Sequence, residues 1–105
     1  WTACSNMENR LESAITADIL KALRKAGAWA EKVHGGPMQS RGLPDIVGGY
    51  RGRLIGLEVK RPGLDATPIQ QHKLGKIATA GGYADVVHSV EEALKVIEVI
   101  DADLE

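Results

Sequence analysis

The sequence predicts one α/β domain, a mixed sheet flanked by helices with the element order α-β-β-β-α-β-α. Its 105 residues, 44% of them hydrophobic and 26% charged, suffice for one compact core but hardly for two. Apolar residues recur at helical spacing in some segments and alternate in others. Clusters of Gly and Pro separate those segments, so the chain divides into short elements joined by turns.

The first half of the chain reads as one helix followed by three strands. Residues 7–26 carry apolar side chains at helical spacing, and Gly27 follows as a helix stop. A tight turn at Arg51-Gly52 joins the second and third strands into a hairpin. The three strand patterns cover residues 28–34, 45–50 and 53–60.

The second half reads as helix, strand and helix. Thr67 suits an N-cap and Pro68 suits the first helical position, so a helix is expected from there to about residue 80. A Val-rich strand follows at 83–88, and Ser89 has capping-box spacing for the start of the last helix. No linker is long enough to separate two domains.

Residues 1–6 show no helical or strand period, and we interpret them as an N-terminal extension or an expression remnant before a domain at 7–105. No apolar run approaches the ~20 residues that a membrane span needs, and the start lacks the pattern of a signal peptide. The single cysteine, Cys4, cannot form an internal disulfide, which agrees with a reducing compartment. We therefore expect a soluble cytoplasmic protein with no membrane partner.

The net charge of -1 conceals an uneven distribution of charge along the chain. Residues 21–76 hold 11 Lys and Arg against 4 Asp and Glu, a balance of +7, whereas the flanks hold 2 against 10, a balance of -8. A basic centre suits a phosphate-binding face on an acidic body, although ordinary solvated surface is an equally good explanation of the charge alone.

A carboxylate and a lysine are expected to share one face of the third strand. Glu58 and Lys60 are two residues apart, and side chains alternate along a strand, so Val59 points to the other side. The hairpin turn brings Asp45 opposite the region of Glu58. Two carboxylates and a lysine at one end of a hairpin suit a divalent cation that activates water for hydrolysis. A surface ion pair explains Glu58 and Lys60 alone, but the three residues together favour function.

Three motifs in this order resemble the VRR-NUC domain, the virus-type replication-repair branch of the PD-(D/E)XK nucleases. They are Arg41-Gly42-Leu43-Pro44-Asp45, Leu57-Glu58-Val59-Lys60-Arg61-Pro62 and Thr67-Pro68-Ile69-Gln70. The likeness extends from about residue 7 to residue 100. It implies a PD-(D/E)XK restriction-endonuclease-like core and a DNA endonuclease dependent on Mg²⁺ or Mn²⁺, in a bacterial or phage-infected cell.

The resemblance also implies roles for single residues. Asp45 and Glu58 would bind the metal with the backbone carbonyl of Val59, Lys60 would be the catalytic lysine, and Glu12 would match the early acidic residue of the family. Gln70 would match a later catalytic glutamine. From the residues alone, Glu12 is equally well a boundary residue of its helix, and Gln70 equally well completes a capping box with Thr67.

Six basic residues surround the predicted site in sequence and are candidates for contact with the DNA backbone, although any one of them is more simply solvated surface. They are Arg41, Arg51, Arg53, Arg61, Lys73 and Lys76. The three histidines, His34, His72 and His88, are too scattered to form a metal site and are expected to line a surface or to bind phosphate.

The resemblance, together with the small size of the chain, leads us to expect a homodimer that cuts branched DNA, with four-way junctions as substrate. Two other functions fit the same residues. One is a catalytically idle domain that only binds branched DNA, and the other is a metal-free protein-interaction domain in which Asp45, Glu58 and Lys60 form a structural ion network.

Overall fold

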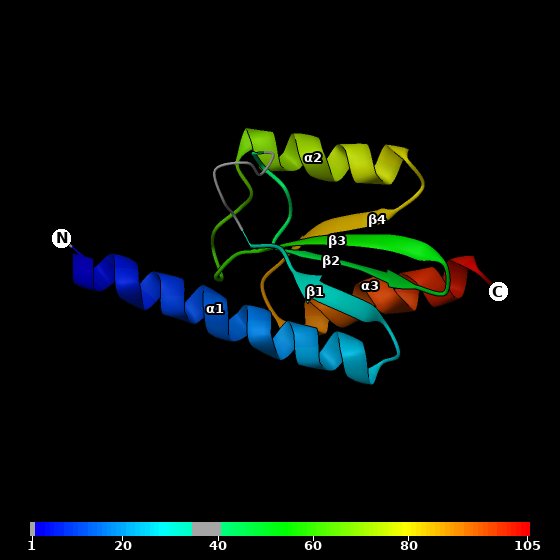
Figure 1. Cartoon of the computed structure of the whole chain (residues 1–105), viewed down its shortest axis with the longest axis horizontal. Coiled ribbons are helices and arrows are strands. Elements are labelled where there is room, and N and C mark those ends of the chain that lie inside the picture. The colour runs from blue at the N-terminus through cyan, green and yellow to red at the C-terminus, as the bar shows by residue number, and fades with distance from the viewer. Residues whose placement is uncertain (1, 35–40) are drawn as a thin grey trace.

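The computed structural model describes residues 2–34 and 41–105, and side chains from residue 11 onward within those ranges. It forms three layers, with the sheet between α2 on one face and α1 with α3 on the other (Figure 1). In chain order the elements are α1 (Thr2–Lys25), β1 (Trp29–Lys32), β2 (Ile46–Tyr50), β3 (Arg53–Val59), α2 (Pro68–Thr79), β4 (Tyr83–Val87) and α3 (Val90–Asp103). The predicted order α-β-β-β-α-β-α is therefore confirmed.

The sheet is mixed, as predicted, with strands in the order β1-β2-β3-β4. β1, β2 and β3 are antiparallel neighbours, whereas β3 and β4 are parallel and connected through α2. Arg51 and Gly52 both have positive φ, 51° and 81°, which matches the tight two-residue turn of a twisted hairpin. That turn fixes the hairpin register, with Tyr50 opposite Arg53 at one end and Ile46 opposite Leu57 at the other.

The main core lies between the sheet and the α1/α3 layer. Ile55, Leu57 and Val59 alternate along β3 toward this side and are buried together with residues of both helices. From α1 come Ile19 and Leu23, and from α3 come Ala93, Val96, Ile97 and Ile100. The opposite face of β3 therefore looks toward α2.

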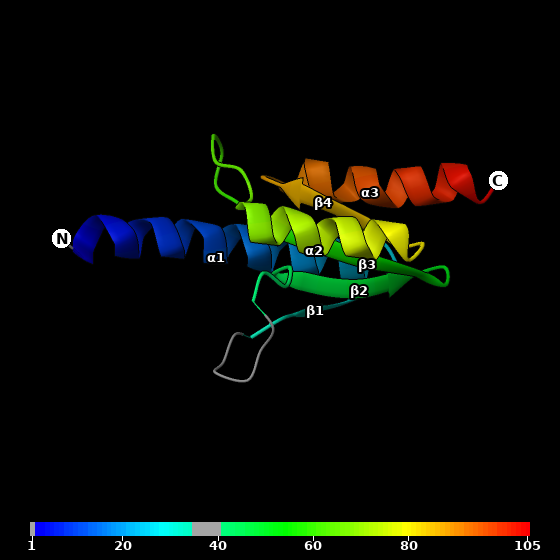
Figure 2. The same cartoon turned by 90° about the horizontal axis from the view of Figure 1, so that it is seen from above.

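α2 covers only part of the other face. It contacts β3 and β4, and in Figure 2 β1 lies to one side of it. Leu74 of α2 is buried, and Ile77 lies so close to the sheet that a Cβ on Gly56 would be 2.5 Å from its Cδ1 atom. This close contact packs α2 directly against the middle of β3.

α1 begins at Thr2, five residues before the predicted start at residue 7. The interpretation of residues 1–6 as an extension rested on their lack of apolar period, yet residues 2–6 contain no Gly or Pro that would stop a helix. The backbone therefore continues as helix beyond the edge of the sheet (Figure 2). Among the helices described, none combines the length and apolar character that crossing a membrane requires.

Candidate active site

Asp45 and Glu58 meet at the open end of the β2–β3 hairpin, as their spacing predicts. Ile46 pairs with Leu57. Asp45, just before β2, therefore lies opposite Glu58, the next residue of β3. Ile46 and Leu57 are both buried in the core on the α1/α3 side. Because side chains alternate, Asp45 and Glu58 both point to the α2 side.

The side chain of Asp45 is held by the backbone of the neighbouring strand. Its Oδ2 atom accepts a hydrogen bond of 2.9 Å from the amide of Val59, and its backbone carbonyl accepts one of 2.7 Å from the amide of Val33. Pro44, before it, is fully buried. The carboxylate is thus fixed in position before any ligand binds.

Glu58 is a buried carboxylate with an unsatisfied oxygen. Its side chain is only 2% exposed, and within the described part of the chain nothing donates a hydrogen bond to Oε2. Burial raises the pKa of Glu58 from 4.5 to about 7, and the charge of Asp45 raises it as well, while the Lys60 ammonium lowers it. An ionised carboxylate that is buried beside a second carboxylate, with one oxygen unpaired, is costly unless a proton or a metal cation accompanies it.

The donor set at this point suits a hard divalent cation such as Mg²⁺ or Mn²⁺. Asp45 and Glu58 supply carboxylate oxygens, and the Val59 carbonyl is the backbone oxygen of the next residue. No group of three His, Cys, Asp or Glu residues with metal-site geometry occurs among residues for which side chains are described. The fit therefore rests on the carboxylate pair and on the unsatisfied oxygen of Glu58.

Glu12 lies near this end of the sheet but is not gathered into one cluster with the pair. Its Oε2 atom accepts a hydrogen bond of 3.3 Å from the amide of Arg61, which follows β3. The bond ties α1 to the segment just beyond Lys60. A contribution of Glu12 to metal binding remains a prediction.

Gln70 forms the capping box that its spacing with Thr67 indicates. Its Oε1 atom accepts a hydrogen bond of 2.9 Å from the Thr67 amide, while the Gln70 amide donates to the Thr67 hydroxyl at 3.4 Å. The bond uses the carbonyl oxygen of the side-chain amide, whose NH₂ group is a separate donor. A catalytic role for Gln70 remains a prediction.

The six predicted DNA contacts do not form one group. Arg51 and Arg53 lie at the turn of the β2–β3 hairpin, roughly 17 Å along the strand from Glu58 by the rise of a strand. Arg51 pairs with Asp101 of α3 at 2.8 Å, in a cluster where Tyr50 also donates to Asp101. The turn of a hairpin is the point farthest from its open end, so these two arginines lie away from the carboxylates, and their contact with DNA remains a prediction.

Of the other four candidates, two flank the strands of the site in sequence and two lie within α2. Arg41 precedes Asp45 in the loop that enters β2, and Arg61 follows Lys60. Lys73 and Lys76 belong to α2, the helix on the same face of the sheet as the carboxylates. DNA contact by these residues remains a prediction.

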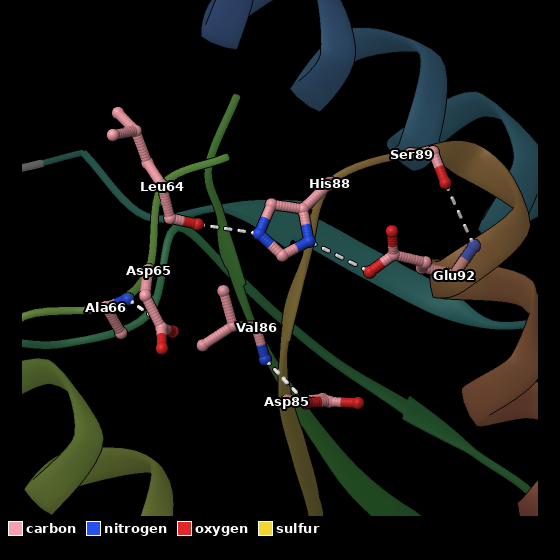
Figure 3. Close-up of polar contacts among 8 residues, drawn as sticks. All are labelled: Leu64, Asp65, Ala66, Asp85, Val86, His88, Ser89 and Glu92. Carbon is pink, nitrogen blue, oxygen red and sulfur yellow. Dashed lines mark hydrogen bonds and ion pairs between the residues drawn. The ribbon is translucent and has the colours of Figure 1, made fainter. Parts of the chain in front are cut away.

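His88 lies against the loop between β3 and α2, among acidic residues that disfavour phosphate binding. Its Nδ1 and Nε2 atoms contact the Glu92 carboxylate at 2.9 Å and the Leu64 carbonyl at 2.7 Å (Figure 3). Asp65 and Asp85 line the same pocket. The hydrogen bond to Glu92, followed by that to Leu64, raises the pKa of His88.

No family model matches the sequence, and no curated protein matches it in a sequence comparison. Among solved structures, one described as a VRR_NUC domain is similar at a TM-score of 0.68 and 23% identity, over 84% of this chain and 95% of its own. A second similar structure is Archaeoglobus fulgidus Hjc, a Holliday junction resolvase from an archaeal hyperthermophile. Its TM-score is 0.59 and its sequence identity 28%, and the match covers 73% of this chain and 67% of Hjc. The chain therefore has the fold of a VRR-NUC domain, as its motifs indicated.

Proposed function

We propose that the protein is a metal-dependent DNA endonuclease that hydrolyses phosphodiester bonds, with four-way junctions as its preferred substrate. The observation that carries the proposal is the buried Glu58, whose Oε2 atom has no partner among the described residues and whose neighbour is a second carboxylate. Such a pair is stabilised by a cation, and Lys60 lies beside it. The similarity to a Holliday junction resolvase supports DNA as the substrate.

In this proposal, the two carboxylates bind the metal ion and Lys60 acts on water and phosphate. Asp45, already fixed by the Val59 amide, and Glu58 would hold a Mg²⁺ or Mn²⁺ ion with the Val59 carbonyl. When bound, such an ion supplies Lewis acidity, which favours ionisation of water and offsets negative charge on phosphate. Lys60 orients the attacking water and stabilises charge that develops on the phosphorus centre. Burial of Glu58 excludes bulk water from one side of the pair.

Cleavage assays on the parent and three variants test the proposal. Asp45→Asn, Glu58→Gln and Lys60→Ala should each lower the cleavage rate by at least ~100-fold with Mg²⁺ or Mn²⁺ present. Asp18→Asn, which changes an exposed carboxylate on α1, is the matched control and should cut like the parent. Retained activity in any two of the three site variants overturns the assignment.

The parent's behaviour decides between this function and the two others considered above. A parent that binds junctions and leaves them intact with either metal is an idle DNA-binding domain. A parent that gives no heat with Mn²⁺ in calorimetry contains a structural ion network in place of a metal site.

We further propose that the protein acts as a symmetric homodimer. One site in a 105-residue chain cuts one strand at a time, and a two-fold dimer places two sites across a junction of similar symmetry. Light scattering at micromolar concentration should give twice the chain mass, and paired nicks should appear in a junction-cleavage assay. A monomer that cuts only flaps or single-stranded ends contradicts this.

A further inference from the structure

The charged side chains of two helices are sorted onto opposite faces of the sheet. α2 has no acidic residue and carries His72, Lys73 and Lys76. α3, on the other face, carries Lys95 against five acidic residues (Figure 1). These are Glu91, Glu92, Glu98, Asp101 and Asp103. A polyanion is thus attracted to α2 and repelled by α3, while α1, in the same layer as α3, carries Lys21, Arg24 and Lys25.

The carboxylate pair lies on the attractive side of the sheet. Asp45 and Glu58 point toward the α2 face, because their neighbours Ile46 and Leu57 are buried on the other one. A phosphodiester that reaches the pair therefore comes from the side of α2. The helix then forms one wall of the approach.

A shallow pocket of about 560 Å³ lies along α2 itself. It is lined by His72, Gly75, Lys76, Thr79 and Ala80. Lys76 supplies a cation, and the imidazole and the hydroxyl of Thr79 supply hydrogen-bond donors. No carboxylate lines it, so its chemistry suits a phosphate group.

Gly75 lines this pocket, and its missing side chain leaves space there. The fold does not require a glycine at this position. Gly75 lies inside the helix, and a Cβ at this position would meet nothing within 4 Å. Its φ is not positive, so the backbone conformation does not require glycine. A glycine inside a helix also lowers stability by about 1 kcal/mol relative to alanine. A missing side chain at an exposed helix position allows a backbone from outside to approach closely.

We propose that the sugar-phosphate backbone of DNA docks on the outer face of α2 around Gly75, between His72, Lys76 and Thr79. The inference rests on the proposed nuclease function and adds the direction from which the substrate is bound. α2 is roughly 18 Å long, about half of one duplex turn of ~34 Å, so a duplex that lies along α2 spans the whole helix. The α3 face is turned away from the DNA.

Two matched lysine variants test the charge. Binding is measured by fluorescence anisotropy with a labelled four-way junction in EDTA, so that cleavage does not interfere. Lys76→Gln should weaken binding and reduce the slope of log K against log salt by about 1. Lys95→Gln, an exposed lysine on α3, should leave both unchanged. Equal losses in the two variants would overturn the proposed orientation.

Gly75→Gln tests the close approach without changing charge. The variant should melt at or above the parent temperature, since glutamine favours helix and nothing obstructs it, but bind the junction about tenfold more weakly. Ala102→Gln, at an exposed position of α3, is the size-matched control and should bind like the parent. Parent-like affinity of Gly75→Gln overturns the inference.

The outcomes separate this inference from the proposed function. If the parent cuts DNA and both α2 variants bind like the parent, the docking surface is wrong and the nuclease proposal stands. If both α2 variants bind weakly and the parent never cuts with either metal, the docking surface stands and the nuclease proposal fails.

Discussion

The metal proposal can be tested without DNA at Asp45, one of the two carboxylates of the pair. A cation that binds only the folded protein raises its free energy of unfolding by about 2.7 kcal/mol at a concentration 100 times its Kd. Mn²⁺ should therefore raise the melting temperature of the parent and of Asp18→Asn, and leave Asp45→Asn close to its metal-free value. An equal rise in all three proteins places the metal away from the hairpin.

His88 should make stability depend on pH near neutrality. Both of its partners, the Glu92 carboxylate and the Leu64 carbonyl, are acceptors, so only the imidazolium donates to both. The pKa of His88 is raised in the folded state, so its contribution is complete below the ordinary value of 6.5 and is lost as pH rises through the raised value. Because the pair is partly exposed, the effect should be below about 1 kcal/mol.

The measurement is the free energy of unfolding in urea across that pH range. His88→Gln should reduce the decline with rising pH, and Glu92→Gln, which keeps an uncharged acceptor, should reduce it by less. The decline that remains in His88→Gln comes from Glu58, whose pKa is also raised in the folded protein. A parent profile parallel to that of His88→Gln rules out this contribution of the histidine.

At the level of elements, two adjacent glycines of β2 should respond in opposite ways to alanine. A Cβ on Gly48 would overlap the carbonyl oxygen of Trp29 in β1, whereas one on Gly49 would meet only the Arg53 carbonyl oxygen, at 3.7 Å. Gly48→Ala should cost about 1–3 kcal/mol, since backbone must move. Gly49→Ala should be neutral or stabilising by about 0.5 kcal/mol. Similar losses in both would mean that β2 tolerates no side chain for another reason.

Variants at the start of α2 distinguish a capping role of Gln70 from a catalytic one. Thr67→Ala and Gln70→Ala should each lower the free energy of unfolding by about 1 kcal/mol, because each removes half of the capping box. Cleavage should fall in Gln70→Ala and remain near the parent rate in Thr67→Ala, since the resemblance to VRR-NUC domains implies a catalytic role for Gln70 and none for Thr67. Equal cleavage rates in the two variants assign Gln70 to the cap alone.

Local chemistry explains which elements the sequence predicted well. The Arg51-Gly52 turn fixes the register of its hairpin, so the meeting of Asp45 and Glu58 follows from counting outward. Thr67 with Pro68, and Ser89 at the last helix, mark helix starts within one residue. The true start of α1 was missed because an apolar period signals burial, and a helix that projects past the sheet has no need of one.

At the scale of the whole molecule, contacts between distant segments had no signal in the sequence. Tyr50 and Asp101 are 51 residues apart, and Arg61 and Glu12 are 49 apart. Nothing local indicates either contact. The charge pattern was visible in the sequence only as a basic centre between acidic ends. The three-layer arrangement places the basic helix α2 and the acidic helix α3 on opposite faces, with Lys21, Arg24 and Lys25 of the basic centre on α1 in the α3 layer.

The carboxylate pair belongs to a single hairpin, and this has a consequence for how the protein folds. Asp45 and Val59 are 14 residues apart, so the hairpin that brings them together closes a short loop at small entropic cost and forms on a timescale of roughly 1–10 μs. The ligands for a cation can therefore assemble before α1 and α3 have docked. A cation that binds this early species lowers the barrier to folding as well as stabilising the product, so Mn²⁺ should accelerate refolding as well as slow unfolding. The same ion would then stabilise the folding nucleus and, in the folded protein, take part in hydrolysis.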